Sequence, residues 1–112
     1  MKKFTFILIL VLSIAISFTA CGKKAPKTAD GKEVVMGFVY VGPIGDGGWT
    51  YAHEQGRLFV EKETGIRTIF KETVAESAEV KDVMRSMIDQ GATIIAATSF
   101  GYMDYVVEMA KE

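Results

Sequence analysis

Short apolar runs alternate along this chain with segments whose apolar residues recur at helical spacing, and this alternation restricts the fold most. Residues 34–41 (VVMGFVYV) and 93–98 (TIIAAT) are continuous β-rich runs, typical of strands buried on both faces. Residues 67–71 (RTIFK) form a shorter run of the same kind. Because a helical segment follows each run, the order predicts a parallel sheet built by right-handed crossovers.

Three helices are expected between and after these strands. Residues 49–64 carry apolar or small residues on one helical face, and Gly65 suits the C-cap. Ser77 can cap the second helix, and Gly91 closes it. The expected face positions are Ala52, Gly56, Phe59 and Val60 in the first helix, Val80, Val83, Met84, Met87 and Ile88 in the second, and Tyr102 or Met103, Val106, Val107 and Ala110 in the third.

The expected fold class is therefore α/β, in the order β-α-β-α-β-α, with helices on both faces of the sheet. In the strand order 2-1-3, the first and third strands are neighbours, and the topological switch point lies between their carboxyl ends. Open α/β sheets bind ligands at such a point. The two unusual loops of the chain, residues 42–48 and 99–101, follow these two strands. We therefore expect the ligand site between these loops.

The loop after the first strand (GPIGDGG, residues 42–48) is rich in glycine, which lets a backbone approach a ligand closely. It lacks the Gly-Lys-Ser/Thr ending of a Walker A loop, and its spacing is not GxGxxG. A phosphate-cradling nucleotide loop is therefore not expected. The alternative is that these glycines only make the turn.

Two aromatic residues and one acidic residue are candidates for ligand contact. Trp49 begins the first helix beside the expected ligand site, a crevice between the two loops. Its indole could stack on a ligand there or pack into the core instead. Phe100, at the mouth of the third strand, is the second aromatic within reach. Asp46 can accept hydrogen bonds from a ligand or stabilise the helix N-terminus. His53 has no Cys or second His near it, so neither a metal site nor a cofactor is expected.

No constellation of residues predicts catalysis. Ser99 has no paired base in the expected crevice, and the carboxylates fall mostly on solvated helix faces. Residues 21–112 carry eleven Lys and Arg against fourteen Asp and Glu. This acidic balance offers no basic surface for nucleic acid. We therefore expect a binding protein that is not an enzyme and has no nucleic-acid partner.

The first residues have the pattern of a bacterial export signal. Two lysines precede an apolar run over residues 4–18, which is shorter than the about twenty residues of a membrane-spanning helix. The run leads to Cys21, the only cysteine, and resembles a lipobox with Phe18 at the usual leucine position. The pattern implies a signal peptide over residues 1–20 and a lipid anchor on Cys21 at the extracytoplasmic face of the cell membrane. Residues 21–33 then form a flexible tether.

Two stretches, MGFVYVGPIGDGGWTYAHEQG (residues 36–56) and AATSFGYMD (residues 96–104), closely resemble the basic membrane protein family of lipoproteins, also called PnrA-like. The resemblance runs from about residue 34 to the end of the chain. It implies that residues 34–112 are an incomplete first lobe of a type I periplasmic-binding-protein fold. It also implies a solute-binding component of an ABC importer, whose partners are a permease and a small-molecule ligand.

The resemblance also assigns site residues. Trp49 matches the aromatic residue that stacks on the base, Asp46 matches an acidic position in the same loop, and Ser99-Phe100-Gly101 matches the segment that lines the pocket. Many nucleoside-binding members carry Ser-Phe-Asn where this chain has Gly48-Trp49-Thr50, so a hydroxyl replaces an amide. The expected ligand is a purine nucleoside or nucleobase. The alternatives are a sugar bound by the same fold and a tethered module that senses a ligand.

The third helical pattern reaches Glu112 without a Gly, Asn or Pro stop signal. A two-lobed binding protein needs two domains of about 100–200 residues each. We therefore expect this chain to be the first part of a longer protein.

Overall fold

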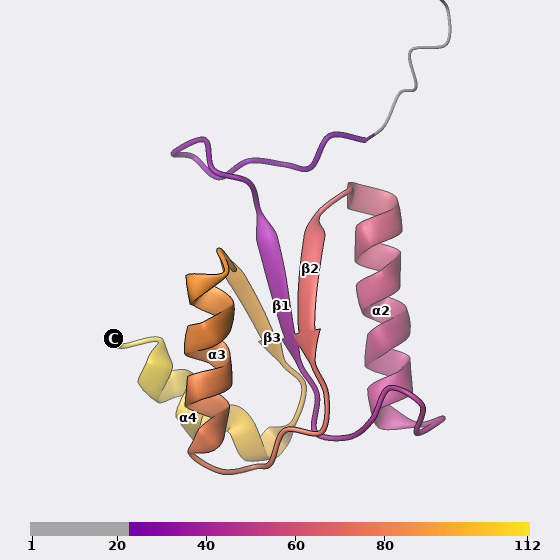
Figure 1. The fold of residues 1–112 in the computed structure, drawn as a ribbon, viewed down its shortest axis with the longest axis vertical. Helices are drawn as coiled ribbons and strands as arrows, with labels where there is room; N and C mark the ends of the chain where they lie inside the picture. Colours follow the sequence, from indigo (N-terminus) through magenta and orange to yellow (C-terminus); the bar gives the residue numbers. More distant parts are fainter. Residues whose placement is uncertain (1–22) are drawn as a thin grey trace, which may run out of the picture.

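The computed structural model describes residues 23–112, so the predicted signal segment and Cys21 lie outside the described residues. Three parallel strands form one sheet in the order β2-β1-β3 (Figure 1). The strands are β1 (Val35–Val39), β2 (Arg67–Lys71) and β3 (Ile94–Ala97), and the helices are α2 (Trp49–Thr64), α3 (Glu79–Asp89) and α4 (Met103–Met109), with a short 3-10 helix η1 (Phe100–Tyr102) before α4. The predicted α/β class and strand order are confirmed.

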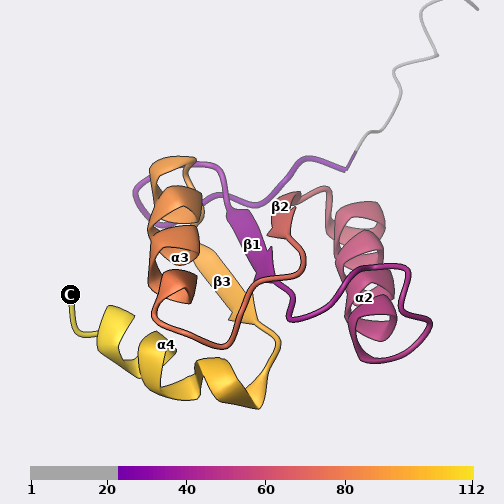
Figure 2. The ribbon, with the colours of Figure 1, turned by 60° about the horizontal axis from the view of Figure 1, so that its bottom comes forward.

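The main core lies between one face of the sheet and the helices α3 and α4. Its buried members are Val35, Val39, Val74, Val80, Met84, Met87, Ala92 and Tyr102. Gly37 leaves room for α3, because a Cβ at this position would lie 2.8 Å from Met87 Sδ. The helices α3 and α4 contact each other, and Figure 2 shows both of them on the side of the sheet away from α2.

The opposite face of the sheet is covered by α2 through a polar interface. The Tyr40 hydroxyl, just after β1, donates to Glu54 Oε2 at 3.0 Å. Arg57 donates to both oxygens of the same carboxylate, at 2.8 and 2.6 Å. Its guanidinium also lies 4.7 Å from the centre of the Phe70 ring. The buried residues of α2 are Thr50, Glu54 and Arg57.

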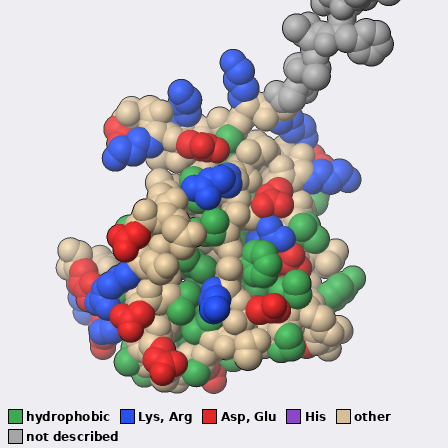
Figure 3. All heavy atoms as spheres, viewed as in Figure 1, with side chains coloured by type: hydrophobic (Ala, Val, Ile, Leu, Met, Phe, Trp, Pro, Cys, Tyr) green, Lys and Arg blue, Asp and Glu red, His purple; other side chains and the backbone are tan. Residues whose placement is uncertain are grey.

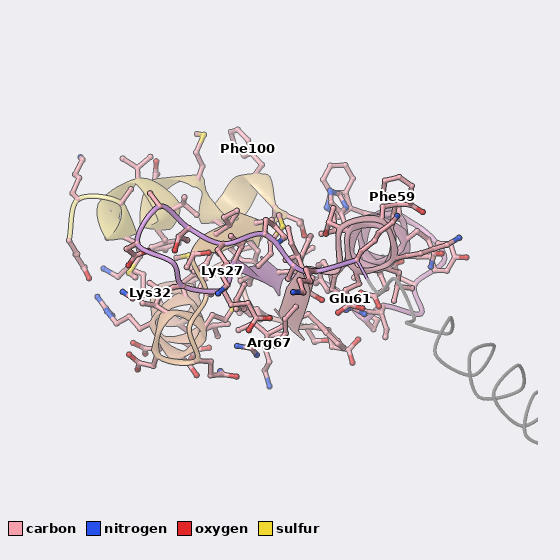
Figure 4. The ribbon with its side chains drawn as sticks, turned by 90° about the horizontal axis from the view of Figure 1, so that it is seen from above. Lys27, Lys32, Phe59, Glu61, Arg67 and Phe100 are labelled. Carbon is pink, nitrogen blue, oxygen red and sulfur yellow. The ribbon has the colours of Figure 1, made fainter. Side chains whose placement is uncertain are left out.

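The apolar face predicted for this helix is therefore not the face that meets the sheet. Ala52, Gly56 and Phe59 are exposed, Phe59 by 64%, and Figure 4 shows Phe59 projecting away from the strands. The reason lies in the sheet, since a buried tyrosine hydroxyl requires a hydrogen-bond partner. Glu54 supplies that partner, and Arg57 neutralises its charge.

The helix ends agree in part with the prediction. α2 has the predicted bounds, and Gly65 is its C-cap in the left-handed conformation, with φ at 70°. Ser77 does not cap α3: the N-cap is Ala78, without a side-chain hydrogen bond, because the Val80 amide donates to the backbone oxygen of Ser77 instead.

The predicted inner faces of the two later helices agree with the structure in part. Ile88, expected on the inner face of α3, is half exposed. Tyr102 is fully buried whereas Met103 is half exposed, so Tyr102 occupies the inward position left open for the third helix.

The segment before β1 crosses the amino ends of the strands (Figure 1). Lys27 and Glu33 form an isolated bridge within it, and Lys23 pairs with Glu63 of α2 at 3.0 Å. Figure 3 shows acidic and basic side chains interspersed over the face of the molecule that is turned toward the viewer in Figure 1. Over residues 23–112, no helix has the length and apolar character needed to cross a bilayer.

Candidate functional site

The carboxyl ends of the three strands share one edge of the sheet, at the bottom of Figure 1, and a loop leaves each of them. The two loops predicted to form the site meet directly at this edge. Trp49 Nε1 donates to the backbone oxygen of Thr98 at 2.6 Å. Because Thr98 follows β3 and Trp49 follows the glycine loop, this hydrogen bond joins the two loops.

The Trp49 side chain lies on the surface, with 61% of the residue exposed. The His53 ring stands 4.7 Å from it, centre to centre, at an angle of 48°. His53 Nδ1 lies 2.7 Å from the backbone oxygen of Trp49, and a carbonyl can only accept, so this nitrogen carries the hydrogen. The indole is therefore held by its N–H edge and by one neighbouring ring, and part of it is open to solvent.

Phe100 is 84% exposed and begins η1. In Figure 4 it projects to the same side of the molecule as Phe59. A shallow hollow lies beside it, lined by Ala97, Ser99, Phe100, Met103, Val106 and Val107. This edge of the sheet therefore offers a second aromatic surface next to an apolar depression.

Asp46 acts as a cap for the start of α2. Its Oδ1 accepts hydrogen bonds from the amides of Gly48 and Tyr51, at 2.8 and 2.9 Å, and its Oδ2 accepts one from Thr50 at 3.0 Å. These amides, Gly48 first, hold the pKa of the carboxyl below its usual value. The structure thus shows the helix-stabilising role that the sequence left open, and ligand contact by Asp46 stays a prediction.

The other predicted site residues differ in accessibility. Thr50 is fully buried, and its hydroxyl oxygen accepts from the Gly42 amide at 3.2 Å. Its side chain therefore stabilises the glycine loop from inside the fold. The Ser99 hydroxyl donates to the Glu76 carboxylate. Gly101 lies directly against this carboxylate, which a Cβ would overlap.

The acidic side chains of the loop after β2 were absent from the predicted site. Glu72 Oε2 accepts from the Ile44 amide of the glycine loop at 2.8 Å, and Glu76 holds Ser99. The signal that could have found them is positional, because the carboxyl ends of parallel strands meet at one edge. Among residues 23–112, no three His, Cys, Asp or Glu side chains lie together in a way that could hold a metal ion.

Comparison with known proteins identifies the family. The model of the PnrA-like family of ABC transporter substrate-binding proteins matches residues 33–112. A relative from Brucella abortus named purine-binding protein is 41% identical over 83 residues, which are 72% of this chain and 24% of the relative. A relative from Haloferax volcanii named putative ABC transporter glucose-binding protein is 32% identical over 85 residues, which are 75% of this chain and 22% of the relative.

The chain therefore spans about a quarter of the length of these curated relatives. The three-stranded parallel sheet with helices on both faces is consistent with a fragment of a periplasmic-binding-protein lobe. The resemblance predicted from the two sequence stretches is confirmed. The chain belongs to the PnrA-like family of ABC transporter substrate-binding proteins.

Proposed function

We propose that this chain is part of a solute-binding protein of an ABC importer, and that the edge between Trp49 and Phe100 takes a purine nucleoside or nucleobase. Family membership supports the importer role, with a permease as partner and no chemical change to the ligand. The Brucella abortus relative named for purine binding supports the ligand class. Acylation of Cys21 would hold the protein at the extracytoplasmic face of the membrane.

The observation that carries this proposal is the exposed indole of Trp49. Its N–H is already bonded to Thr98, so what it offers a ligand is a flat aromatic surface. A flat ring stacked on such a surface contributes about 1–3 kcal/mol. A purine has two fused rings to place there, which favours a base over a ligand read mainly by hydroxyl groups.

A sugar is the second candidate, since the Haloferax volcanii relative is named for glucose binding. The apolar face of a pyranose can also lie on an indole, but its hydroxyls require several polar partners. Asp46, the charged residue of the glycine loop, already accepts three backbone hydrogen bonds. This arrangement favours the purine.

The experiment follows Trp49, the only tryptophan, by nuclear magnetic resonance of the isotopically labelled chain. Adenosine, adenine and glucose are titrated separately. One stacked base contributes only about 1–3 kcal/mol, so we expect dissociation constants of several millimolar or weaker. Ring currents from a purine should shift the Trp49 and Phe100 signals, and glucose should leave them in place. Shifts with glucose alone would support the sugar, and unmoved signals with all three compounds would reject the proposal.

A further inference from the structure

The loop after β2 is hydrogen-bonded to the glycine loop at two points. Glu72 Oε2 accepts from the Ile44 amide at 2.8 Å, and the Thr73 amide donates to the Gly42 oxygen at 3.2 Å. One bond uses a side chain and the other the backbone. The position of the glycine loop, and of Trp49 after it, therefore depends on residues 72 and 73.

The same loop is also bonded to the turn after β3. Glu76 accepts from the Ser99 hydroxyl, and the buried Tyr102 hydroxyl donates to the Val74 oxygen at 2.6 Å. Burial, and then the Glu76 charge, raise the pKa of Tyr102 to about 12, so its hydroxyl remains a donor at neutral pH. Gly101 allows the close approach, because a side chain there would displace the Glu76 carboxylate.

The three loops at the carboxyl edge are thus joined pairwise, since Trp49 closes the third side on Thr98. Thr73, in the middle, has φ at 55°. This left-handed conformation is rare for a β-branched residue and persists only where surrounding contacts impose it. Thr73 lies between Glu72 and Glu76, whose carboxylates hold different loops.

We infer that residues 72–76 form a clasp, in which Glu72 positions the loop of Trp49 and Glu76 positions the turn of Phe100. The clasp fixes the positions of the two loops that carry these aromatic residues. The effect of the clasp on ligand affinity rests on the proposed function. Its stabilisation of the Trp49–Thr98 hydrogen bond does not, because that bond forms without a ligand. Glu72 and Glu76 are positioning residues because they act through the loops they hold.

The test measures hydrogen exchange of the Trp49 indole N–H in the chain without ligand. Opening of the loops exposes this hydrogen, and its exchange rate reports how often they open. Losing one solvent-accessible hydrogen bond of ordinary strength should speed exchange about 5- to 10-fold in Glu72→Ala and Glu76→Ala. Glu72→Gln and Glu76→Gln keep an acceptor and should stay within about 2-fold of the parent chain.

Glu79→Ala is the matched control, because Glu79 is an exposed acidic residue in the first turn of α3. It should leave the indole exchange unchanged. Exchange of core amides such as that of Val39 should not change in any variant, which separates loop opening from global unfolding. Combining Glu76→Ala with Ser99→Ala should add nothing, since both remove the same bond. Alanine variants that exchange like the parent chain would overturn the clasp.

Adenosine titration of the same variants distinguishes the clasp from the proposed function. We expect adenosine to bind about 5-fold more weakly to each alanine variant, with glutamine restoring binding. If the parent chain binds no adenosine but indole exchange follows the expected pattern, the proposed function fails and the clasp stands. If all variants bind adenosine equally with unchanged exchange, the clasp fails and the proposed function stands.

Discussion

Asp46 and Trp49 have different roles at the start of α2. The Asp46 carboxylate accepts from three amides, so its negative charge stabilises the N-terminal turn of the helix. This turn sets the direction of Trp49, whose N–H then reaches Thr98. The acidic residue of the glycine loop thus orders the residue that we propose contacts the ligand.

Replacing Trp49 with Ala should weaken purine binding by about 1–3 kcal/mol, or roughly 5- to 150-fold, because one stacking surface is lost. Stability should change little, since the residue is 61% exposed, whereas losing a core tryptophan costs about 3–5 kcal/mol. Ligand titration and urea unfolding of the same variant measure both quantities. A large loss of stability with normal purine binding would identify Trp49 as a core residue.

At the scale of elements, α2 differs most from an ordinary amphipathic helix. Its buried side carries an ion pair, Glu54 with Arg57, whose side chains are each 9% exposed. Arg57 is further bonded to Glu61 and to Thr68 of β2. The contact between α2 and the sheet therefore depends on directional hydrogen bonds that a purely apolar interface would lack.

We expect Arg57→Ala to destabilise the fold by about 3 kcal/mol, because it leaves the Glu54 charge buried without its partner. The double variant Glu54→Gln, Arg57→Met is the control, since it removes both charges and keeps an acceptor for Tyr40. It should be much closer to the parent chain in its free energy of unfolding. Urea denaturation gives these values. A single variant as stable as the double variant would mean that the pair is not coupled.

The same interface predicts a pH dependence. Hydrogen bonds from Arg57, the largest contribution, lower the pKa of Glu54 from its ordinary 4.5. The folded chain thus binds this proton less readily than the unfolded chain. Glu54 therefore stabilises the fold fully above about pH 4.5, and this contribution is lost as the pH falls through its folded-state pKa. Unfolding free energies across this range should fall less steeply in Glu54→Gln, and equal slopes would contradict the assignment.

At the scale of the whole molecule, the two ends of the sheet have different surroundings. The segment from Lys23 lies at the amino ends of the strands, and the candidate site lies at the carboxyl ends (Figure 1). A lipid anchor at Cys21 would join the chain at the amino side. We propose that this places the ligand edge on the side away from the membrane.

Metabolic labelling with a fatty acid tests the anchor. Cells that express the parent chain should incorporate the label, and cells that express Cys21→Ser should not, because the thiol is the acylated group. A Ser99→Ala variant, which leaves Cys21 intact, serves as the labelled control. Equal labelling of the parent chain and Cys21→Ser would show that the thiol carries no lipid.

Much of the fold followed from local sequence patterns. The three apolar runs became β1, β2 and β3, and the segment from Trp49 to Thr64 became a helix with these bounds. The sequence also predicted that the loops after β1 and β3 would lie together, because the strand order makes these strands neighbours. Local periodicity was misleading for α2, since the partners of its polar face, Tyr40 and Thr68, lie outside the helix.

The sequence by itself therefore determined the element order, the family and the edge at which the loops meet. These depend on patterns within a few residues and on the general rules for parallel sheets. Only the tertiary structure assigned Asp46 to the amides of α2, and Glu72 and Glu76 to the two loops of the site. Hydrogen bonds between residues 23 or 28 positions apart depend on how the loops are brought together in space. The strand order places these loops at one edge of the sheet, but it does not specify which side-chain and backbone atoms pair between them.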